Sequence, residues 1–120
     1  MSTTPRDPVL GSMTAQLRRP RNATPPLNED QFQQRIIDLC KYRHLLVFHD
    51  KDSRKNERGF PDLVIVGNRT IFRELKTDAG ALRPDQKVWL ERLHASGEDA
   101  RIWRPKHWMV ITQEISELAR

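Results

Sequence analysis

Two short apolar runs joined by a turn signal constrain the fold of this chain more than any other feature. The runs cover residues 62–66 and 70–76, and Gly67-Asn68 between them is typical of a tight hairpin turn. The first run is apolar after its opening Asp62, as expected for a central strand covered on both faces. The stretch 59–77 therefore predicts two neighbouring antiparallel strands in the middle of a sheet.

Polar residues stand at the ends of these two predicted strands. Strand side chains alternate between faces, so Glu74 and Lys76 point the same way while Leu75 points into the opposite layer. Tight pairing brings Asp62 close to the same spot. Two carboxylates and one ammonium would then converge, which is the layout of metal-dependent phosphodiester hydrolysis. The alternative is a cross-strand ion pair between Glu74 and Lys76 on a solvated face.

The remaining elements follow from helix and strand signals on either side of this stretch. Asn28 and Gln31 form a capping box that predicts a helix running to about residue 43. Pro84 opens a second helix that ends near residue 96, where Gly97 is the expected C′ residue. Further strands are expected at 45–49 and 100–103, and a terminal helix at 108–119. The predicted order αβββαβ plus a terminal helix gives an α/β fold with a central mixed sheet of about four strands flanked by helices.

Composition divides the chain into two parts. Residues 1–26 contain five prolines and no periodicity, which predicts a disordered arm, and residues 27–120 are expected to form one folded domain. The arm holds four arginines and one acid, whereas the rest of the chain holds 17 bases and 15 acids. A basic arm suits contact with a polyanion, and a solubilising leader is the alternative.

Cysteine content and hydropathy favour an intracellular protein. A single cysteine, Cys40, excludes a disulfide framework and fits a reducing compartment. No apolar run approaches the roughly 18 residues of a membrane span, and the N-terminus lacks the apolar core of a secretory signal. We therefore expect no membrane contact and a cytoplasmic location.

The polar cluster suits magnesium. Asp62, Glu74 and the Leu75 backbone carbonyl are oxygen ligands of the kind that Mg²⁺ prefers. Lys76 can hold the attacking water and offset the charge that develops on the phosphate. No Cys/His spacing in the chain suggests zinc.

Two residues and one loop are candidates for the surroundings of this site. Glu29 lies on the inward stripe of the first helix and can add a carboxylate through a metal-bound water; a simple dipole-favouring acid is the alternative. Gln86 lies on the mainly apolar stripe of the second predicted helix and can orient a water or a phosphate. The charged loop before Gly59 either contacts phosphates beside the active site or is merely solvated, and its basic residues are Lys51, Arg54, Lys55 and Arg58.

Together these residues resemble a known family. Gly59-Phe60-Pro61-Asp62, Glu74-Leu75-Lys76 and Gln86 are similar to the motifs of the PD-(D/E)xK nuclease superfamily, and more narrowly to its virus-type replication-repair (VRR-NUC) group. The resemblance covers roughly residues 27–110 and implies a restriction-endonuclease-like fold with Mg²⁺ or Mn²⁺ as cofactor.

By the family pattern, Asp62, Glu74 and Lys76 take the core catalytic positions, Glu29 that of the helix acid and Gln86 that of the accessory glutamine. Arg83 departs from this pattern, because a capping Ser or Thr is expected there. Small stand-alone members of the group resemble dimeric Holliday-junction resolvases.

The resulting hypothesis is a homodimeric, Mg²⁺-dependent DNA endonuclease acting on branched DNA, with the four-way junction as the preferred substrate. Such an enzyme would serve replication, recombination or repair in the cytoplasm of a bacterial cell or phage-infected host, at the nucleoid when bound to DNA. A flap-specific repair nuclease and a non-catalytic DNA-binding module on the same fold are the alternatives. RNA as the substrate stays open.

Overall fold

A four-stranded mixed sheet forms the centre of the computed structural model, which describes residues 27–50 and 57–120. The strands are β1 (Leu46–His49), β2 (Leu63–Val66), β3 (Thr70–Leu75) and β4 (Asp99–Trp103), in the spatial order β1-β2-β3-β4. β1 and β2 pair antiparallel, as do β2 and β3, whereas β3 and β4 are parallel. A parallel pair needs a crossover, which the helix between β3 and β4 supplies. The predicted α/β architecture with a mixed sheet is confirmed.

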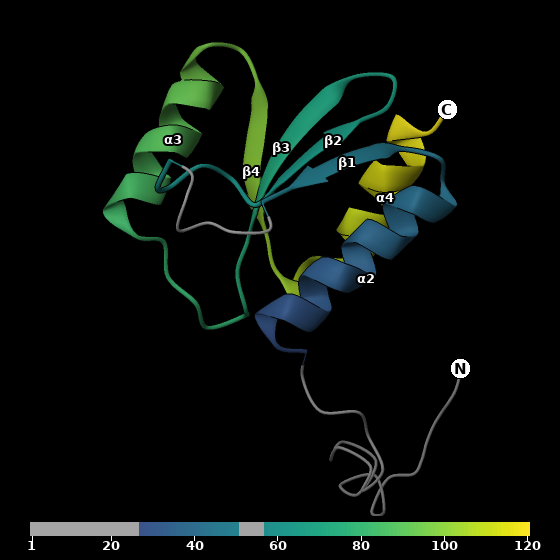
Figure 1. Ribbon diagram of the computed structural model, residues 1–120, viewed down its shortest axis with the longest axis horizontal. Helices are drawn as coiled ribbons and strands as arrows, with labels where there is room; N and C mark the ends of the chain where they lie inside the picture. Colours follow the sequence, from purple (N-terminus) through teal and green to yellow (C-terminus); the bar gives the residue numbers. More distant parts are fainter. Residues whose placement is uncertain (1–26, 51–56) are drawn as a thin grey trace, which may run out of the picture.

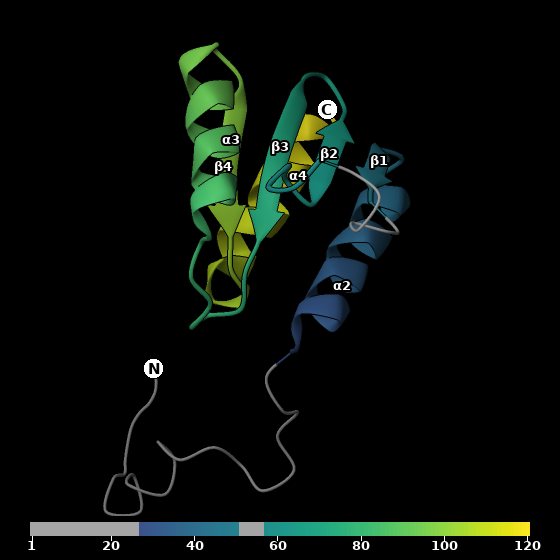
Figure 2. The same ribbon diagram turned by 60° about the vertical axis from the view of Figure 1, so that its left-hand side comes forward.

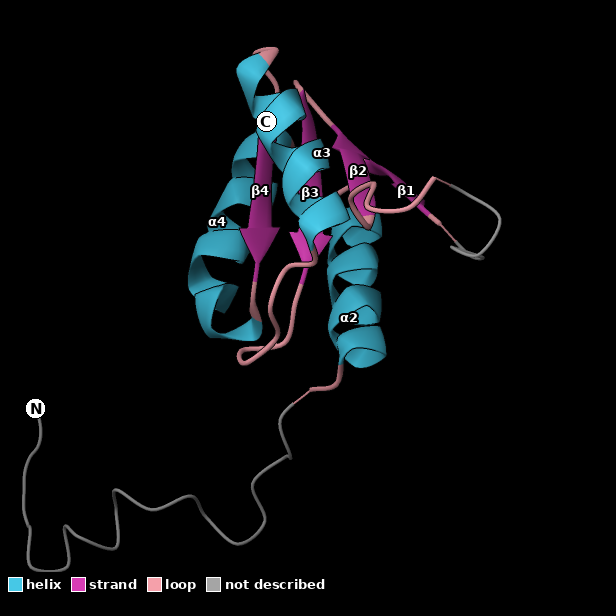
Figure 3. Ribbon diagram, turned by 90° about the vertical axis from the view of Figure 1, so that its left-hand side faces the viewer, coloured by secondary structure: helices cyan, strands magenta, loops and turns pink. Residues whose placement is uncertain are grey.

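Helices cover both faces of this sheet. α2 (Glu29–Tyr42) and α4 (Trp108–Leu118) lie on one face, and α3 (Pro84–Ala95) lies on the other (Figures 1 and 2). Figure 3 shows the same layers from the α3 side. A short 3-10 turn, η2 (Pro105–His107), connects β4 to α4. No helix within the described ranges is long and apolar enough to cross a bilayer.

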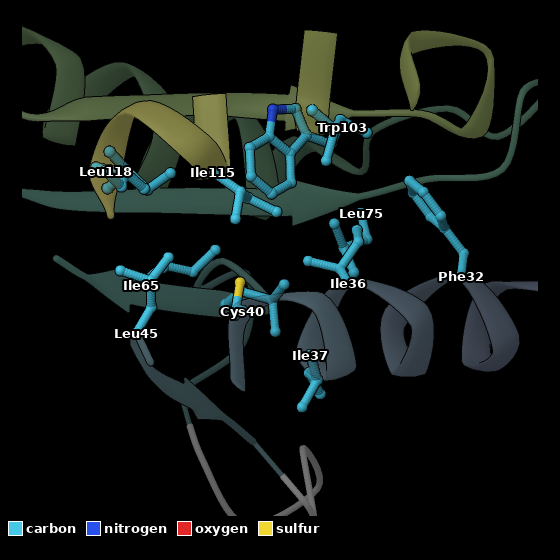
Figure 4. Packing of buried hydrophobic residues seen from close by; sticks show 13 residues of the cluster. Phe32, Ile36, Ile37, Cys40, Leu45, Ile65, Leu75, Trp103, Ile115 and Leu118 are labelled. Atoms are coloured by element: carbon cyan, nitrogen blue, oxygen red, sulfur yellow. The ribbon is translucent and has the colours of Figure 1, made fainter. Parts of the chain in front are cut away.

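The main core lies between the sheet and the α2–α4 layer. Phe32, Ile36 and Cys40 project from α2 toward β2 and β3, and Ile115 reaches the same region from α4 (Figure 4). All four side chains are completely buried. Burying a large aliphatic or aromatic side chain contributes about 1.5–3 kcal/mol, so this layer holds α2 firmly against the sheet.

The two helix starts differ in how they are capped. At α2 the predicted capping box is present, because Gln31 N donates to Asn28 Oδ1 at 2.8 Å and Asn28 N donates to Gln31 Oε1 at 3.1 Å. At α3 Arg83 supplies no side-chain cap, and its backbone N–H donates instead to Gln86 Oε1 at 2.9 Å. The side chain of Gln86 therefore takes part in the start of its own helix.

One expectation about β2 is wrong. The apolar run predicted a strand covered on both faces, yet Val66 is 39% exposed. Leu46 and Phe48, which pair with Val66 and Val64 from β1, are 72% and 60% exposed. The physical reason is that α3 packs beside β4 at the far side of the sheet (Figure 1). The predicted arm at 1–26 and most of the basic loop, 51–56, lie outside the described residues.

Candidate active site

The end of the β2–β3 hairpin gathers the predicted polar residues. The register pairs Leu63 with Arg73, so Asp62 lies opposite Glu74 one step beyond. Leu75 N donates to Asp62 Oδ2 at 2.8 Å, which ties the Asp62 carboxylate to the end of β3. The structure thus brings Asp62 to Glu74 as the hairpin pattern predicts.

Glu74 is the best-buried acid of this group. Gln86 Nε2 donates to Glu74 Oε2 at 2.8 Å, and Lys76 Nζ lies 3.7 Å from the same oxygen. The exposed fractions of Glu74, Lys76 and Gln86 are 1%, 9% and 5%, so the alternative of a solvated surface ion pair is wrong. The second oxygen of Glu74, Oε1, is buried and receives no hydrogen bond from any described residue.

Burial and like charge perturb the acids of the site. Burial is the main cause that raises the pKa of Glu74 to about 8, and the negative charge of Asp62 adds to the effect. Burial, followed by the charge of Asp62, also raises the pKa of Glu29. The positive charge of Lys76 acts on both carboxyls and lowers their pKa, but it does not outweigh burial and the negative charge of Asp62. An added cation would relieve this remaining excess of negative charge.

A cleft of about 680 Å³ opens above these residues. Glu29 reaches it from the first turn of α2, so the predicted helix acid faces the same space as Asp62 and Glu74. Described acids outnumber described bases in its lining: the acids are Glu29, Asp30, Asp50, Glu57, Asp62 and Glu74, and the bases are Arg58, Lys76 and Arg83.

The donor set fits a hard divalent cation. Within residues 27–50 and 57–120, no group of three or more His, Cys, Asp or Glu side chains is gathered to hold a metal, so Glu29 does not join Asp62 and Glu74 in one cluster. Mg²⁺ is commonly bound through one or two carboxylates, with waters and substrate phosphates completing its shell. Asp62, the partnerless Glu74 Oε1 and the backbone at Leu75 match that pattern.

The predicted DNA-contacting residues are only partly described. Lys51, Arg54 and Lys55 lie outside the described residues, whereas Arg58 is exposed at the rim of the cleft. The sequence reasoning missed Asp85, which lies 3.6 Å from Arg58 Nε and 3.3 Å from Arg83 Nε. An acid in the first turn of a helix is ordinary, so no sequence signal marked Asp85.

Comparisons with known proteins agree with this geometry. The family model of the VRR-NUC domain matches residues 11–106. A solved structure described as a "VRR_NUC domain protein" is similar to the chain with a TM-score of 0.61 and 20% sequence identity, covering 78% of this chain and 92% of that one. At that identity the likeness concerns the fold alone. The search of curated proteins returned no match.

Proposed function

The chain belongs to the VRR-NUC family of PD-(D/E)xK-type nucleases, and from this premise we propose that it is a metal-dependent endonuclease of branched DNA. The preferred substrate is a four-way junction, and the acting form is a homodimer. The observation that carries the proposal is the Glu74 carboxylate, which is almost fully buried yet lines an acid-rich cleft beside Asp62 of the neighbouring strand. A nuclease site needs this concentration of oxygen ligands, and a purely structural core does not.

Asp62, Glu74 and the Leu75 carbonyl would hold Mg²⁺, and Mn²⁺ would substitute for it. When bound, the metal supplies Lewis-acid activation of a water and neutralises charge that builds on the phosphate. Glu29 lies on the α2 side of the cleft and would contribute through a metal-bound water.

Lys76 and Gln86 act as the polar partners of Glu74. Lys76 Nζ, 3.7 Å from Glu74 Oε2, is directed by that contact and can hold the attacking water or donate to a phosphate oxygen. Gln86 is fixed at both ends of its amide, by Arg83 N at 2.9 Å and by Glu74 Oε2 at 2.8 Å. Gln86 therefore keeps one Glu74 oxygen occupied, so that the other stays available to a ligand.

The junction preference carries a structural requirement. Cutting two symmetric strands needs two active sites, so a resolvase is expected to act as a dimer. The chain is therefore predicted to sediment as a dimer at the concentrations at which it cuts junctions. A monomer that prefers flaps would replace the resolvase proposal with a structure-specific repair nuclease.

Cleavage assays test the proposal. Four-way junction, flap and duplex DNA are incubated with the full chain in Mg²⁺, in Mn²⁺ and in EDTA. We expect metal-dependent cutting that is fastest on the junction and absent in EDTA. Binding to DNA without cleavage under every metal condition would instead identify a non-catalytic DNA-binding module.

A further inference from the structure

The cleft is rich in acids, although the substrate proposed for it is a polyanion. Its described lining holds six acids and three bases, and one of these bases, Lys76, is already engaged by Glu74. A DNA backbone is a polyanion, so an acid-rich cleft repels it unless cations meet it at the rim. Arg58 and Arg83 are the remaining cations in that part of the lining which the structure describes.

Both arginines are tethered to one carboxylate. Arg58 Nε lies 3.6 Å from Asp85 Oδ2, and Arg83 Nε lies 3.3 Å from Asp85 Oδ1. Burial acts to raise the pKa of the Asp85 carboxyl, but the charge of Arg83 and hydrogen bonds outweigh it and lower that pKa. Asp85 therefore remains ionised and holds two guanidinium groups on the same side of α3.

The outer nitrogens of both guanidinium groups remain available. Side chains of Arg58 and Arg83 are 79% and 52% exposed, and each reaches Asp85 through Nε. Their Nη groups make no hydrogen bond with the described residues of the chain. A guanidinium presents a planar fork of donors that matches the geometry of a phosphate, and here two forks face outward from one anchor.

Local packing fixes the backbone that carries Arg58. Gly59 has φ +91°, and a Cβ at this position would lie 2.5 Å from the Asp85 carbonyl oxygen, so the turn can approach α3 only with glycine. Trp89 Nε1 donates to the Arg58 carbonyl oxygen at 3.2 Å. The Trp89 ring packs edge-on against the ring of Phe60, with 5.1 Å between the ring centres. These contacts hold the backbone of Arg58 against α3.

Arg83 is linked to the catalytic group through Gln86. The Arg83 N–H donates to the same Gln86 side chain that donates to Glu74. The first turn of α3 therefore sets the position of both arginines relative to Glu74.

We propose that Arg58 and Arg83, held by Asp85, form a binding site for a DNA backbone phosphate next to the one that is cut. This assignment rests on the proposed nuclease function, since it takes the DNA backbone as the ligand. Arg58 and Arg83 bind the phosphate, and Asp85 is a positioning residue. Bound there, the strand lies at the rim of the cleft with its neighbouring phosphate directed toward Glu74 and Asp62.

Salt-dependent binding tests the phosphate site. Arg58→Gln, Arg83→Gln and the control Arg92→Gln are made in a Glu74→Gln background, so that the junction DNA stays intact in Mg²⁺. Arg92 is exposed on the same helix and does not line the cleft. Fluorescence anisotropy then gives the slope of log affinity against log salt concentration. Each of the two site variants should reduce the magnitude of that slope by about 0.9, whereas the control leaves it unchanged.

A third variant separates positioning from bulk charge. Asp85→Asn makes the rim more positive, so bulk attraction alone predicts tighter binding, whereas loss of the shared anchor predicts weaker binding. Binding as tight as that of the parent, or salt slopes for Arg58→Gln and Arg83→Gln that match the Arg92→Gln control, would overturn the assignment.

The outcomes also distinguish this assignment from the proposed function. Cleavage by the wild-type protein with unchanged slopes removes the phosphate site but keeps the nuclease. Reduced slopes without any cleavage keep the phosphate site and remove the nuclease.

Discussion

β3 carries two buried charged residues in succession, and the alternation of the strand sends Arg73 and Glu74 to opposite faces of the sheet. Arg73 is completely buried among partners of opposite charge. Its Nη1 lies 2.9 Å from Asp99 Oδ1, its Nη2 lies 3.1 Å from Glu114 Oε1, and its guanidinium stacks 5.0 Å from the centre of the Trp103 ring.

Glu74 is almost as buried, but its surroundings include a group of the same charge. One oxygen is held by Gln86 and Lys76, the second has no hydrogen-bond partner among the described residues, and the nearest carboxylate is that of Asp62. The first cluster is complete in charge, because two carboxylates face Arg73, although Arg73 Nε has no hydrogen-bond partner among the described residues. The second is incomplete in charge, because Asp62 and Glu74 face the single base Lys76, and the proposed cation would offset that excess. Burial alone therefore does not distinguish a structural charge from a functional one, and neither does a single buried atom without a hydrogen-bond partner, whereas the balance of charge among the neighbours does.

The largest effect on stability is expected at the complete cluster. Arg73→Met leaves Asp99 and Glu114 without their central partner, and removing one member of a buried ion pair costs about 3–5 kcal/mol. Urea unfolding should show this loss, while Arg92→Met, an exposed control on α3, should change the free energy of unfolding by less than about 0.5 kcal/mol. A loss as small as that of the control would mean that the Arg73 cluster does not stabilise the fold.

The incomplete cluster should respond to pH in the metal-free protein. The pKa of Glu74 is raised from 4.5 to about 8, so its contribution to stability is fully present below the unfolded-state value and is lost as pH rises through about 8. Between about pH 5 and pH 7 the wild-type protein in EDTA should lose on the order of 2 kcal/mol relative to Glu74→Gln. Parallel pH profiles for the two proteins would contradict the raised pKa.

An added cation should reverse that loss. Mg²⁺ or Mn²⁺ that binds only the folded state stabilises it by about 1.4 kcal/mol at a metal concentration of ten times Kd. Thermal unfolding with and without metal should show this shift in the wild-type protein and in Arg73→Met, because the Arg73 cluster faces the other side of the sheet. An equal shift in Glu74→Gln would mean that the metal binds elsewhere.

The smallest effect is expected at acid pH. Burial acts to raise the pKa of Asp99, but hydrogen bonds from Arg73, Arg101 and Arg69 outweigh it and hold that pKa well below its usual range. This contribution is present above the unfolded-state pKa and is lost as pH falls. From about pH 4 downward the wild-type protein should lose on the order of 1 kcal/mol more than Asp99→Asn, since Asp99 is partly exposed. If the stability of the wild-type protein and of Asp99→Asn fell equally with pH, the lowered pKa of Asp99 would be contradicted.

Local signals were enough to predict the position of the catalytic candidates. The Gly67-Asn68 turn sets the register of the hairpin, and that register with strand alternation brings Asp62 to Glu74. Gln86 was a candidate because a polar residue stood on an apolar helix stripe, and its side chain does contact Glu74.

The sequence could not predict interactions between elements that are distant along the chain. Arg73 stands at a buried position of β3, where an apolar side chain is usual. Its partners Asp99 and Glu114 come from β4 and α4. The pairing of Arg58 with Asp85 likewise depends on how the Gly59 turn approaches α3. Such contacts are set by tertiary packing, for which neither periodicity nor turn chemistry provides a signal.

Glu74→Gln tests the central claim most directly, because stability and cleavage can be measured on the same protein at about pH 7. We predict a variant at least as stable as the metal-free wild-type protein, whose single-turnover cleavage of a four-way junction in Mg²⁺ is reduced by at least about 10²–10³-fold. An unfolded variant would show that Glu74 is a structural charge like Arg73. A folded variant that still cuts the junction at the wild-type rate would contradict the assignment of Glu74 to a metal-dependent nuclease site.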